Sequence, residues 1–268
     1  MLSAARGLLR PLPPPGPEAP EIHLLTGRSL WYQTAFFLRS LQRFLPVRPV
    51  IHSDGSLEGS ALASLRRVVP FARFVAPAES EERVDQFLPR SRFPSLRSRR
   101  DSLVLFRKLL DVHAGAQGWH LFCDSDMLVF HPPRALAEWL DGPSGAVHMT
   151  DVERSYGYEL SLLEELAGGA VPDLVNTGIL GLPSHRLDWD WLEYGCRALI
   201  ERAGTHYYQE QAVVALALAR LPHAALSPAE YRVLPDEVEA RSRTAAVHHY
   251  VAGSKRWYFR ENWRQVPL

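Results

Sequence analysis

Residues 121–130 read Leu121-Phe122-Cys123-Asp124-Ser125-Asp126-Met127-Leu128-Val129-Phe130, and this stretch decides the fold. An apolar run that starts at Trp119 predicts a buried strand, which ends abruptly at the carboxylates of Asp124 and Asp126. Two neighbouring buried anions repel each other unless a cation neutralises them, and a divalent metal with oxygen ligands can do so. The alternative is a strand that ends in an exposed acidic turn. Because the Asp124-Ser125-Asp126 segment directly follows an apolar strand, a metal site is retained as the more specific hypothesis.

Strands and helices are expected to alternate on both sides of this stretch. Short apolar runs predict strands at residues 22–25, 49–52, 119–123, 145–150, 174–182 and 245–250. Apolar residues at helical spacing predict helices at residues 30–45, 103–113, 158–167, 189–203 and 210–220, with Asp101 or Ser102 capping the second. This alternation predicts an α/β sandwich with a mainly parallel central sheet in a single domain. Such sheets bind ligands at the carboxyl ends of their strands.

The composition excludes several classes of protein. Apolar residues make up 46% and charged residues 22% of the 268 positions, which excludes a disordered chain. The formal net charge is zero, which argues against a nucleic-acid-binding protein. No run of about 18 apolar residues exists, so no transmembrane segment is expected. The two cysteines, Cys123 and Cys196, exclude a disulfide framework and favour a reducing compartment, which predicts a cytoplasmic protein.

The first 20 residues differ from the rest of the chain. They are rich in proline, which predicts a flexible leader over residues 1–20 and a folded domain over residues 21–268. Arg6 and Arg10 bracket too short an apolar run for a secretory signal peptide. A second polar stretch, residues 78–101, is rich in arginine, and its arginines are expected to form a solvated surface.

A second group of polar residues lies near the C-terminus, within residues 247–257. Its sequence begins Val247-His248-His249 and offers imidazole for a metal and Gly253 for close backbone approach. It also holds Lys255, one of only two lysines in the chain, as a compact positive charge for a phosphate. The alternative is that adjacent histidines are structural or surface residues.

These motifs resemble those of GT-A nucleotide-sugar glycosyltransferases, closest to glycosyltransferase family 8, the type of glycogenin and bacterial lipopolysaccharide sugar transferases. In that family an Asp-x-Asp after a strand binds manganese and the donor diphosphate, a role that falls on residues Asp124-Ser125-Asp126. A His followed by Lys six residues later and Trp eight residues later supplies the third metal ligand and a diphosphate contact. Here these residues are His249, Lys255 and Trp257.

The resemblance also implies residues around the donor sugar. An Asn-x-Gly segment that orients the sugar is matched by Asn176-Thr177-Gly178. An acidic residue followed by Gln, beside the anomeric carbon, is matched by Glu210 and Gln211. A family Asp that hydrogen-bonds sugar hydroxyls falls on Asp151. These six residues are therefore expected to surround the transferred sugar.

The chain departs from the family pattern at several positions, so it is interpreted as a divergent relative. Glu210 stands where the family has Asp, and Arg256 stands where the family has Pro. The family glycine appears one place later, at Gly253. These changes leave the implied metal ligands in place.

The nucleotide is expected to dock where the first two strands end. This assigns nucleotide binding to Leu25, Thr26, Gly27 and Asp54, with a simple Asx turn as the alternative for Asp54. Lys108, on the helix before the Asp-x-Asp strand, could face the diphosphate or lie on a solvated helix face. Aromatic residues could form an acceptor platform or pack in the core: Trp189, Trp191, Trp257, Tyr258 and Trp263.

The implied activity is metal-dependent transfer of a sugar from a nucleoside-diphosphate sugar, expected to be a UDP-sugar, to a glycan, lipid or small-molecule acceptor. Mn²⁺ or Mg²⁺ would act as a Lewis acid on the leaving diphosphate, and Lys255 would add positive charge there. Family members retain the anomeric configuration, which implies front-face attack or a covalent intermediate on Glu210 or Asp151. The alternative function is a catalytically inactive GT-A scaffold that binds nucleotide sugars or glycans.

Overall fold

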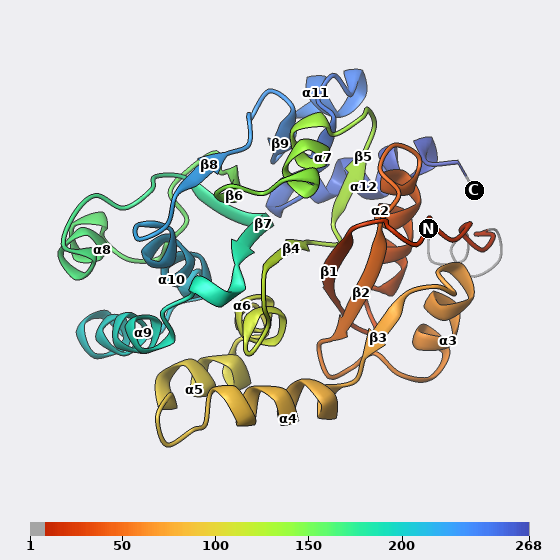
Figure 1. Cartoon of the computed structure of the whole chain (residues 1–268). Helices are drawn as coiled ribbons and strands as arrows, with labels where there is room; N and C mark the ends of the chain where they lie inside the picture. The colour runs from red at the N-terminus through yellow and green to blue at the C-terminus, as the bar shows by residue number, and fades with distance from the viewer. Residues whose placement is uncertain (1–8, 268) are drawn as a thin grey trace. The chain divides into compact units, whose positions relative to one another are not determined.

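A computed structural model of the chain describes residues 9–267 and divides into two compact units. The first unit contains the chain up to Pro77, then Cys123–Gly142, and then the chain from Leu226 onward. The second unit contains Ala78–Phe122 and Pro143–Ala225. Figure 1 shows the elements of both units along the chain. Each unit is therefore built from separate stretches of sequence.

A parallel sheet with strand order β3-β2-β1 opens the first unit. Its strands are β1 (Glu21–Thr26), β2 (Arg48–Ser53) and β3 (Arg73–Val75), and its helices are α2 (Trp31–Gln42) and α3 (Gly59–Val68). In β1 and β2 Glu21 pairs with Arg48 and Thr26 pairs with Ser53, so both strands end at the same edge. That edge is where a parallel sheet presents its loops to a ligand.

Residues 9–20 contain no helix or strand, as their prolines predict, but part of this stretch packs on the first unit. Leu9 and Leu12 are buried, and the Leu12 N–H donates to the Val68 carbonyl over 2.8 Å. Residues 1–8 of the predicted leader lie outside the described residues. The boundary predicted at residue 20 remains a prediction.

A second sheet of the first unit has the order β5-β10-β9, with β5 (Met127–Val129), β9 (Tyr231–Val233) and β10 (Val247–His249). Strand β10 runs antiparallel to β5, with His249 opposite Met127, and parallel to β9. The other elements of this part are α7 (Arg134–Asp141), α11 (Glu237–Ser242), η2 (Ala252–Ser254), α12 (Lys255–Arg260) and η3 (Asn262–Gln265). This sheet therefore joins the Asp-x-Asp stretch to the C-terminal motif.

The second unit has the strand order β4-β7-β6-β8. Its strands are β4 (Trp119–Cys123), β6 (Ala146–Thr150), β7 (Val175–Pro183) and β8 (His223–Ala225), with the last residue of β4, Cys123, counted in the first unit. Its helices are α4 (Pro77–Phe87), α5 (Pro94–Ser102), α6 (Phe106–His113), α8 (Leu160–Ala167), α9 (Trp189–Ala203) and α10 (Gln209–Leu218), with η1 (Ser184–Arg186) after β7. Strand β6 is antiparallel to β7 and parallel to β8.

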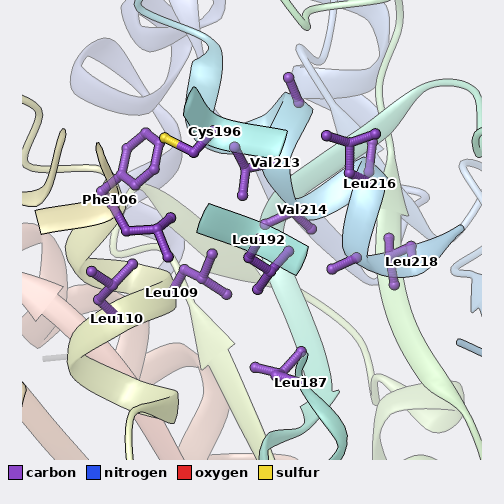
Figure 2. Close-up of a cluster of buried hydrophobic side chains, with 14 of the residues drawn as sticks. Phe106, Leu109, Leu110, Leu187, Leu192, Cys196, Val213, Val214, Leu216 and Leu218 are labelled. Carbon is purple, nitrogen blue, oxygen red and sulfur yellow. The ribbon is translucent and has the colours of Figure 1, made fainter. Parts of the chain in front are cut away.

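The core of the second unit lies among α6, α9, α10 and β7. Figure 2 shows Phe106 and Leu109 of α6 in one cluster with Cys196 of α9 and Val213 of α10. All ten residues of α10 and all nine of β7 are buried, which explains why both read as nearly continuous apolar runs. The burial of α10 fixes the place of its first residues, among them Glu210 and Gln211.

Two expectations are wrong, one for the arginine-rich stretch and one for the helix that follows it. Arg97 and Arg100 are buried rather than solvated, because Arg97 pairs with Asp85 at 2.6 Å and Arg100 pairs with Asp111 at 2.5 Å. The helix expected from residue 103 begins at Phe106, because α5 already runs to Ser102 and Leu103 is extended. Ser102 therefore ends one helix instead of capping the next.

The predicted α/β class with mainly parallel strand pairing is confirmed: β1 with β2, β2 with β3 and β6 with β8 pair in parallel, whereas β6 with β7 pairs antiparallel. Among the described residues, no helix has both the length and the apolar character needed to span a membrane.

Candidate functional site

The first cluster of predicted site residues lies where β5 pairs with β10. His249 pairs with Met127, and this register brings the imidazole next to Asp126, one residue earlier in the chain. The His249 Nε2 lies 3.2 Å from Asp126 Oδ1 and 3.7 Å from Asp124 Oδ2. One ligand atom from each of Asp124, Asp126 and His249 lies within 4.8 Å of the others. The structure therefore brings the three predicted metal ligands together.

Lys255 completes this cluster from the start of α12. Its Nζ lies 3.2 Å from Asp126 Oδ2, and its side chain is 46% exposed. Burial alone would raise the pKa of Asp126, but the charges and hydrogen bonds of His249 and Lys255 lower it well below its usual range. Asp126 therefore stays ionised, as a metal ligand must be. Two carboxylates and one imidazole form a donor set that fits Mn²⁺ or Mg²⁺.

The ends of β1 and β2 meet as predicted. The Asp54 N–H donates to the Thr26 carbonyl over 2.9 Å, and a Cβ at Gly27 would lie 1.9 Å from Asp54 Oδ2. Residue 27 must therefore be glycine for the Asp54 carboxylate to take this place. Asp54 Oδ1 also accepts the Ser56 N–H over 2.7 Å, which forms the alternative Asx turn. Leu25, just before this edge, is half-buried.

The second cluster of predicted residues lies within the second unit, at the end of β6. Met149 pairs with Asn176 in the antiparallel register, and Asp151 stands two residues after Met149, so the Asp151 and Asn176 side chains share one face of this strand pair. Asp151 Oδ2 accepts the Asn176 amide over 3.1 Å and the Gln211 amide over 3.3 Å. The Asn176 Oδ1 in turn accepts the Gly178 N–H over 3.0 Å. These four residues are thus tied together by their own polar groups.

Gln211 is held in one orientation. Its Nε2 donates to Asp151 Oδ2 and, over 3.0 Å, to the Ser155 carbonyl. An amide nitrogen has two hydrogens to donate, so both are used. The carbonyl oxygen is the end of the Gln211 amide that remains for a ligand.

Glu210 lies at the start of α10 and is almost fully buried. Its Oε2 accepts the Thr177 hydroxyl over 2.9 Å. Glu210 is in the first turn of the helix, where the positive end of the helix dipole favours a carboxylate. The acidic residue and the Asn-x-Gly segment, far apart in sequence, therefore converge in this unit.

The remaining predicted residues are placed as follows. Lys108 is buried rather than solvated, and its ammonium lies 5.3 Å from the centroid of the Phe122 ring. Ser125 is buried, and Gly253 has open space where a side chain would stand. Ala252, where the family glycine would fall, has a left-handed φ of 43°. Trp257 and Tyr258 are buried, which fits core packing.

Sequence reasoning missed the residues that support the first cluster. The Tyr250 N–H donates to the Asp126 carbonyl over 2.9 Å, and its side chain bonds to His248 and Asn262. Tyr250 follows His249 directly, and this adjacency is the only sequence signal of its importance.

The chain resembles known proteins in its fold, whereas sequence comparisons find no match. No protein-family model matches the chain, and no curated protein matches it in sequence. Mouse xyloside xylosyltransferase 1, solved in its apo form, superposes with a TM-score of 0.59 at 13% identity, over 87% of this chain and 98% of its own. The galactosyltransferase LgtC, solved with donor and acceptor sugar analogues, superposes with a TM-score of 0.53 at 13% identity, over 92% of this chain and 100% of its own.

A third solved structure with a similar fold is a yeast enzyme. The mannosyltransferase Ktr4p from S. cerevisiae superposes with a TM-score of 0.50 at 12% identity, over 82% of this chain and 74% of its own. At such low identity a likeness reports on backbone architecture and not on substrate. The chain therefore has the GT-A fold of these glycosyltransferases.

Proposed function

We propose that the chain is a metal-dependent glycosyltransferase that takes its sugar from a nucleoside-diphosphate donor, with UDP as the nucleotide. The observation that carries the proposal is the convergence of Asp124, Asp126 and His249, with Lys255, in a chain of this fold. Three solved neighbours are glycosyltransferases by name.

The first cluster serves the diphosphate end of the donor. Asp124, Asp126 and His249 would hold Mn²⁺ or Mg²⁺, which would supply Lewis-acid stabilisation to the departing diphosphate. Lys255 adds a positive charge that balances the negative charge of the leaving group. The edge formed by Thr26, Gly27 and Asp54 takes the nucleoside.

The second cluster serves the sugar end of the donor. Asp151 and Asn176 orient the sugar through its hydroxyls, and the buried Glu210 carboxylate stabilises positive charge that develops at the anomeric carbon. The carbonyl oxygen of Gln211 contributes in the same sense. The proposed outcome is retention, by front-face attack or through a covalent intermediate on Glu210 or Asp151.

Thermal unfolding with a panel of nucleotide sugars, each with and without Mn²⁺, tests the proposal. A ligand that binds the folded chain raises its melting temperature according to concentration and affinity. We expect stabilisation by one nucleoside-diphosphate sugar or its nucleotide, and only with metal present. Release of free nucleotide from that donor, followed over time, then measures transfer to water or acceptor.

Two variants make the test specific. Asp126→Asn removes a ligand charge and should abolish both the stabilisation and the turnover. Asp141→Asn removes an exposed carboxylate at the end of α7 in the same unit and should change neither. Metal-independent turnover, or equal turnover in Asp126→Asn and the parent chain, contradicts the proposal. Metal-dependent binding without any turnover identifies the inactive scaffold instead.

A further inference from the structure

A chain of buried hydrogen bonds lies behind the first cluster. It links four residues of the first unit: Glu239 of α11, His248 of β10, Tyr250, and Asn262 of η3. Asn262 Nδ2 lies 2.7 Å from the Tyr250 hydroxyl, and that hydroxyl lies 3.0 Å from His248 Nδ1. His248 Nε2 lies 2.7 Å from Glu239 Oε1. His248, Tyr250 and Asn262 are fully buried.

The two end members of this hydrogen-bond series, Glu239 and Asn262, determine which atom donates at each bond. A carboxylate only accepts, so His248 donates from Nε2 to Glu239. The Asn262 amide nitrogen can only donate, so the single hydrogen of the Tyr250 hydroxyl points to His248 Nδ1, which accepts it. The Tyr250 oxygen is then left to accept the Asn262 amide. The Tyr250 hydroxyl therefore bonds to His248 of β10 on one side and to Asn262 of η3 on the other.

Tyr250 also touches the candidate site through its backbone and its ring. Its N–H donates to the carbonyl of Asp126, the residue that contacts both His249 and Lys255. Its ring packs edge to face on Tyr258, with centroids 5.2 Å apart. Tyr258 stands three residues after Lys255 on α12, so the two side chains lie on neighbouring parts of one helix face.

We propose that Tyr250 is the positioning residue of the first cluster: its hydroxyl fastens the C-terminal segment to β10 and thereby holds Lys255 beside Asp126. It touches neither metal nor donor and acts through Lys255. The consequence for donor binding rests on the proposed function, whereas the consequence for the ion pair does not. The decisive substitution is Tyr250→Phe, which keeps the ring and the backbone N–H and removes only the hydroxyl.

The ligand-free chain offers a direct measurement. Lys108 and Lys255 are its only lysines, so reductive ¹³C-methylation gives separate NMR signals for two side chains and the terminal amine. Asp126→Asn provides the reference signal of Lys255 without its charged partner. We expect Tyr250→Phe to move the Lys255 signal toward that reference and to leave the Lys108 signal in place.

Tyr231→Phe is the matched control. Tyr231 is a buried tyrosine of β9 in the same sheet, and its hydroxyl accepts the Leu136 N–H over 3.0 Å. That variant loses a comparable hydrogen bond on the side of α7 and should not move the Lys255 signal. An unchanged Lys255 signal in Tyr250→Phe, or an equal movement in both variants, overturns the positioning role whether or not the chain binds UDP.

Titration calorimetry with UDP and Mn²⁺ extends the test to binding. We expect Tyr250→Phe to weaken UDP binding by roughly two- to tenfold, the effect of about one hydrogen bond. In a Lys255→Ala background the same substitution should have an effect under about twofold, because the group it positions is gone. A full effect in that background contradicts action through Lys255. Absence of UDP binding by the parent chain contradicts the proposed function and leaves the NMR result to decide the positioning role.

Discussion

Lys255 is the cation that neutralises Asp126 in the ligand-free chain. Its ammonium lies 3.2 Å from the carboxylate that a divalent ion would also bind. Two cations on one carboxylate repel each other, so a metal ion bound by Asp126 would weaken the contact between Asp126 and the Lys255 ammonium. Under the proposed function, the ammonium would then be available to the donor phosphate, and metal binding and donor binding would be linked.

We expect Lys255→Ala to bind Mn²⁺ more tightly than the parent chain when no nucleotide is present, by at least roughly threefold, because a competing charge is removed. With UDP present, the same variant should bind UDP more weakly, by about 1–3 kcal/mol. Calorimetry measures both. Arg256→Ala removes the neighbouring positive charge and is the control for long-range electrostatics. An equal gain in Mn²⁺ affinity in both variants contradicts direct competition.

The negative charge of Glu210 is expected to matter for turnover more than for binding. Glu210→Gln keeps an oxygen that can accept the Thr177 hydroxyl and changes only the charge. If that charge stabilises the transition state, turnover should fall roughly a hundredfold while UDP binding stays nearly unchanged. Steady-state kinetics with the donor found in the panel measure this, and Glu201→Gln, an exposed carboxylate of α9, is the control. Normal turnover with a lowered melting temperature would identify a helix-capping role instead.

Elements with a strong local signal could be predicted from the sequence. The strand at residues 119–123 and the helix at residues 189–203 match β4 and α9 at both ends. The boundary between α5 and α6 could not, because Asp101 and Ser102 are good capping residues wherever they stand. The burial of Arg97 and Arg100 could not be predicted either, since their partners lie on α4 and α6. Which segments meet is decided by tertiary packing, and a single sequence does not show it.

The ion pair between Arg100 of α5 and Asp111 of α6 is expected to contribute strongly to the free energy of unfolding. Both side chains of this ion pair are buried. The start of α5 is held separately by Glu193 of α9, which accepts the N–H groups of Ser95 and Leu96 at 2.9 Å each. Arg100→Met leaves the Asp111 carboxylate buried without its cation, which should lower the free energy of unfolding by about 3–5 kcal/mol. Urea unfolding measures this.

An exposed ion pair just before the start of α5 is the control. Arg92 pairs with Asp190 on the surface at 2.5 Å, and both side chains are more than half exposed. Arg92→Met should therefore change the free energy of unfolding by less than about 1 kcal/mol. Similar losses in the two variants would contradict the view that burial makes the Arg100 pair decisive.

For the whole molecule, stability should depend on pH through His248. Burial lowers its pKa to about 4 in the folded chain, against about 6.5 in an unfolded one. Between these values the unfolded chain binds a proton that the folded chain does not. Stability from this residue is therefore complete above about pH 6.5 and is lost as the pH falls toward about 4, at up to about 1.4 kcal/mol per unit. Urea unfolding across that range should show a flatter dependence in His248→Gln than in the parent chain, and parallel curves would contradict it.

How much of the candidate site could be predicted differs between its two clusters. Asp124, Asp126 and His249 were assigned from an Asp-x-Asp after a strand and a distant His-Lys spacing, and the structure brings them together. Asp151, Asn176 and Gln211 carry no local signal of their own, and only the resemblance assigned them. The hydrogen-bond chain through Tyr250 could not be predicted, because a buried tyrosine looks the same in sequence whether its hydroxyl supports a site or merely fills a core.

The first unit is assembled from three stretches of chain, and this has a consequence for synthesis on the ribosome. Asp126 emerges with the middle stretch, whereas His249 and Lys255 belong to the last one. All residues of the second unit are made before that last stretch begins at Leu226. A nascent chain therefore carries Asp124 and Asp126 through the translation of some hundred further residues before His249 and Lys255, which contact them in the folded chain, exist. If the chain binds a metal as proposed, its complete ligand set is available only late in synthesis, and ribosome-bound intermediates that stop before residue 249 should bind Mn²⁺ more weakly than the full chain.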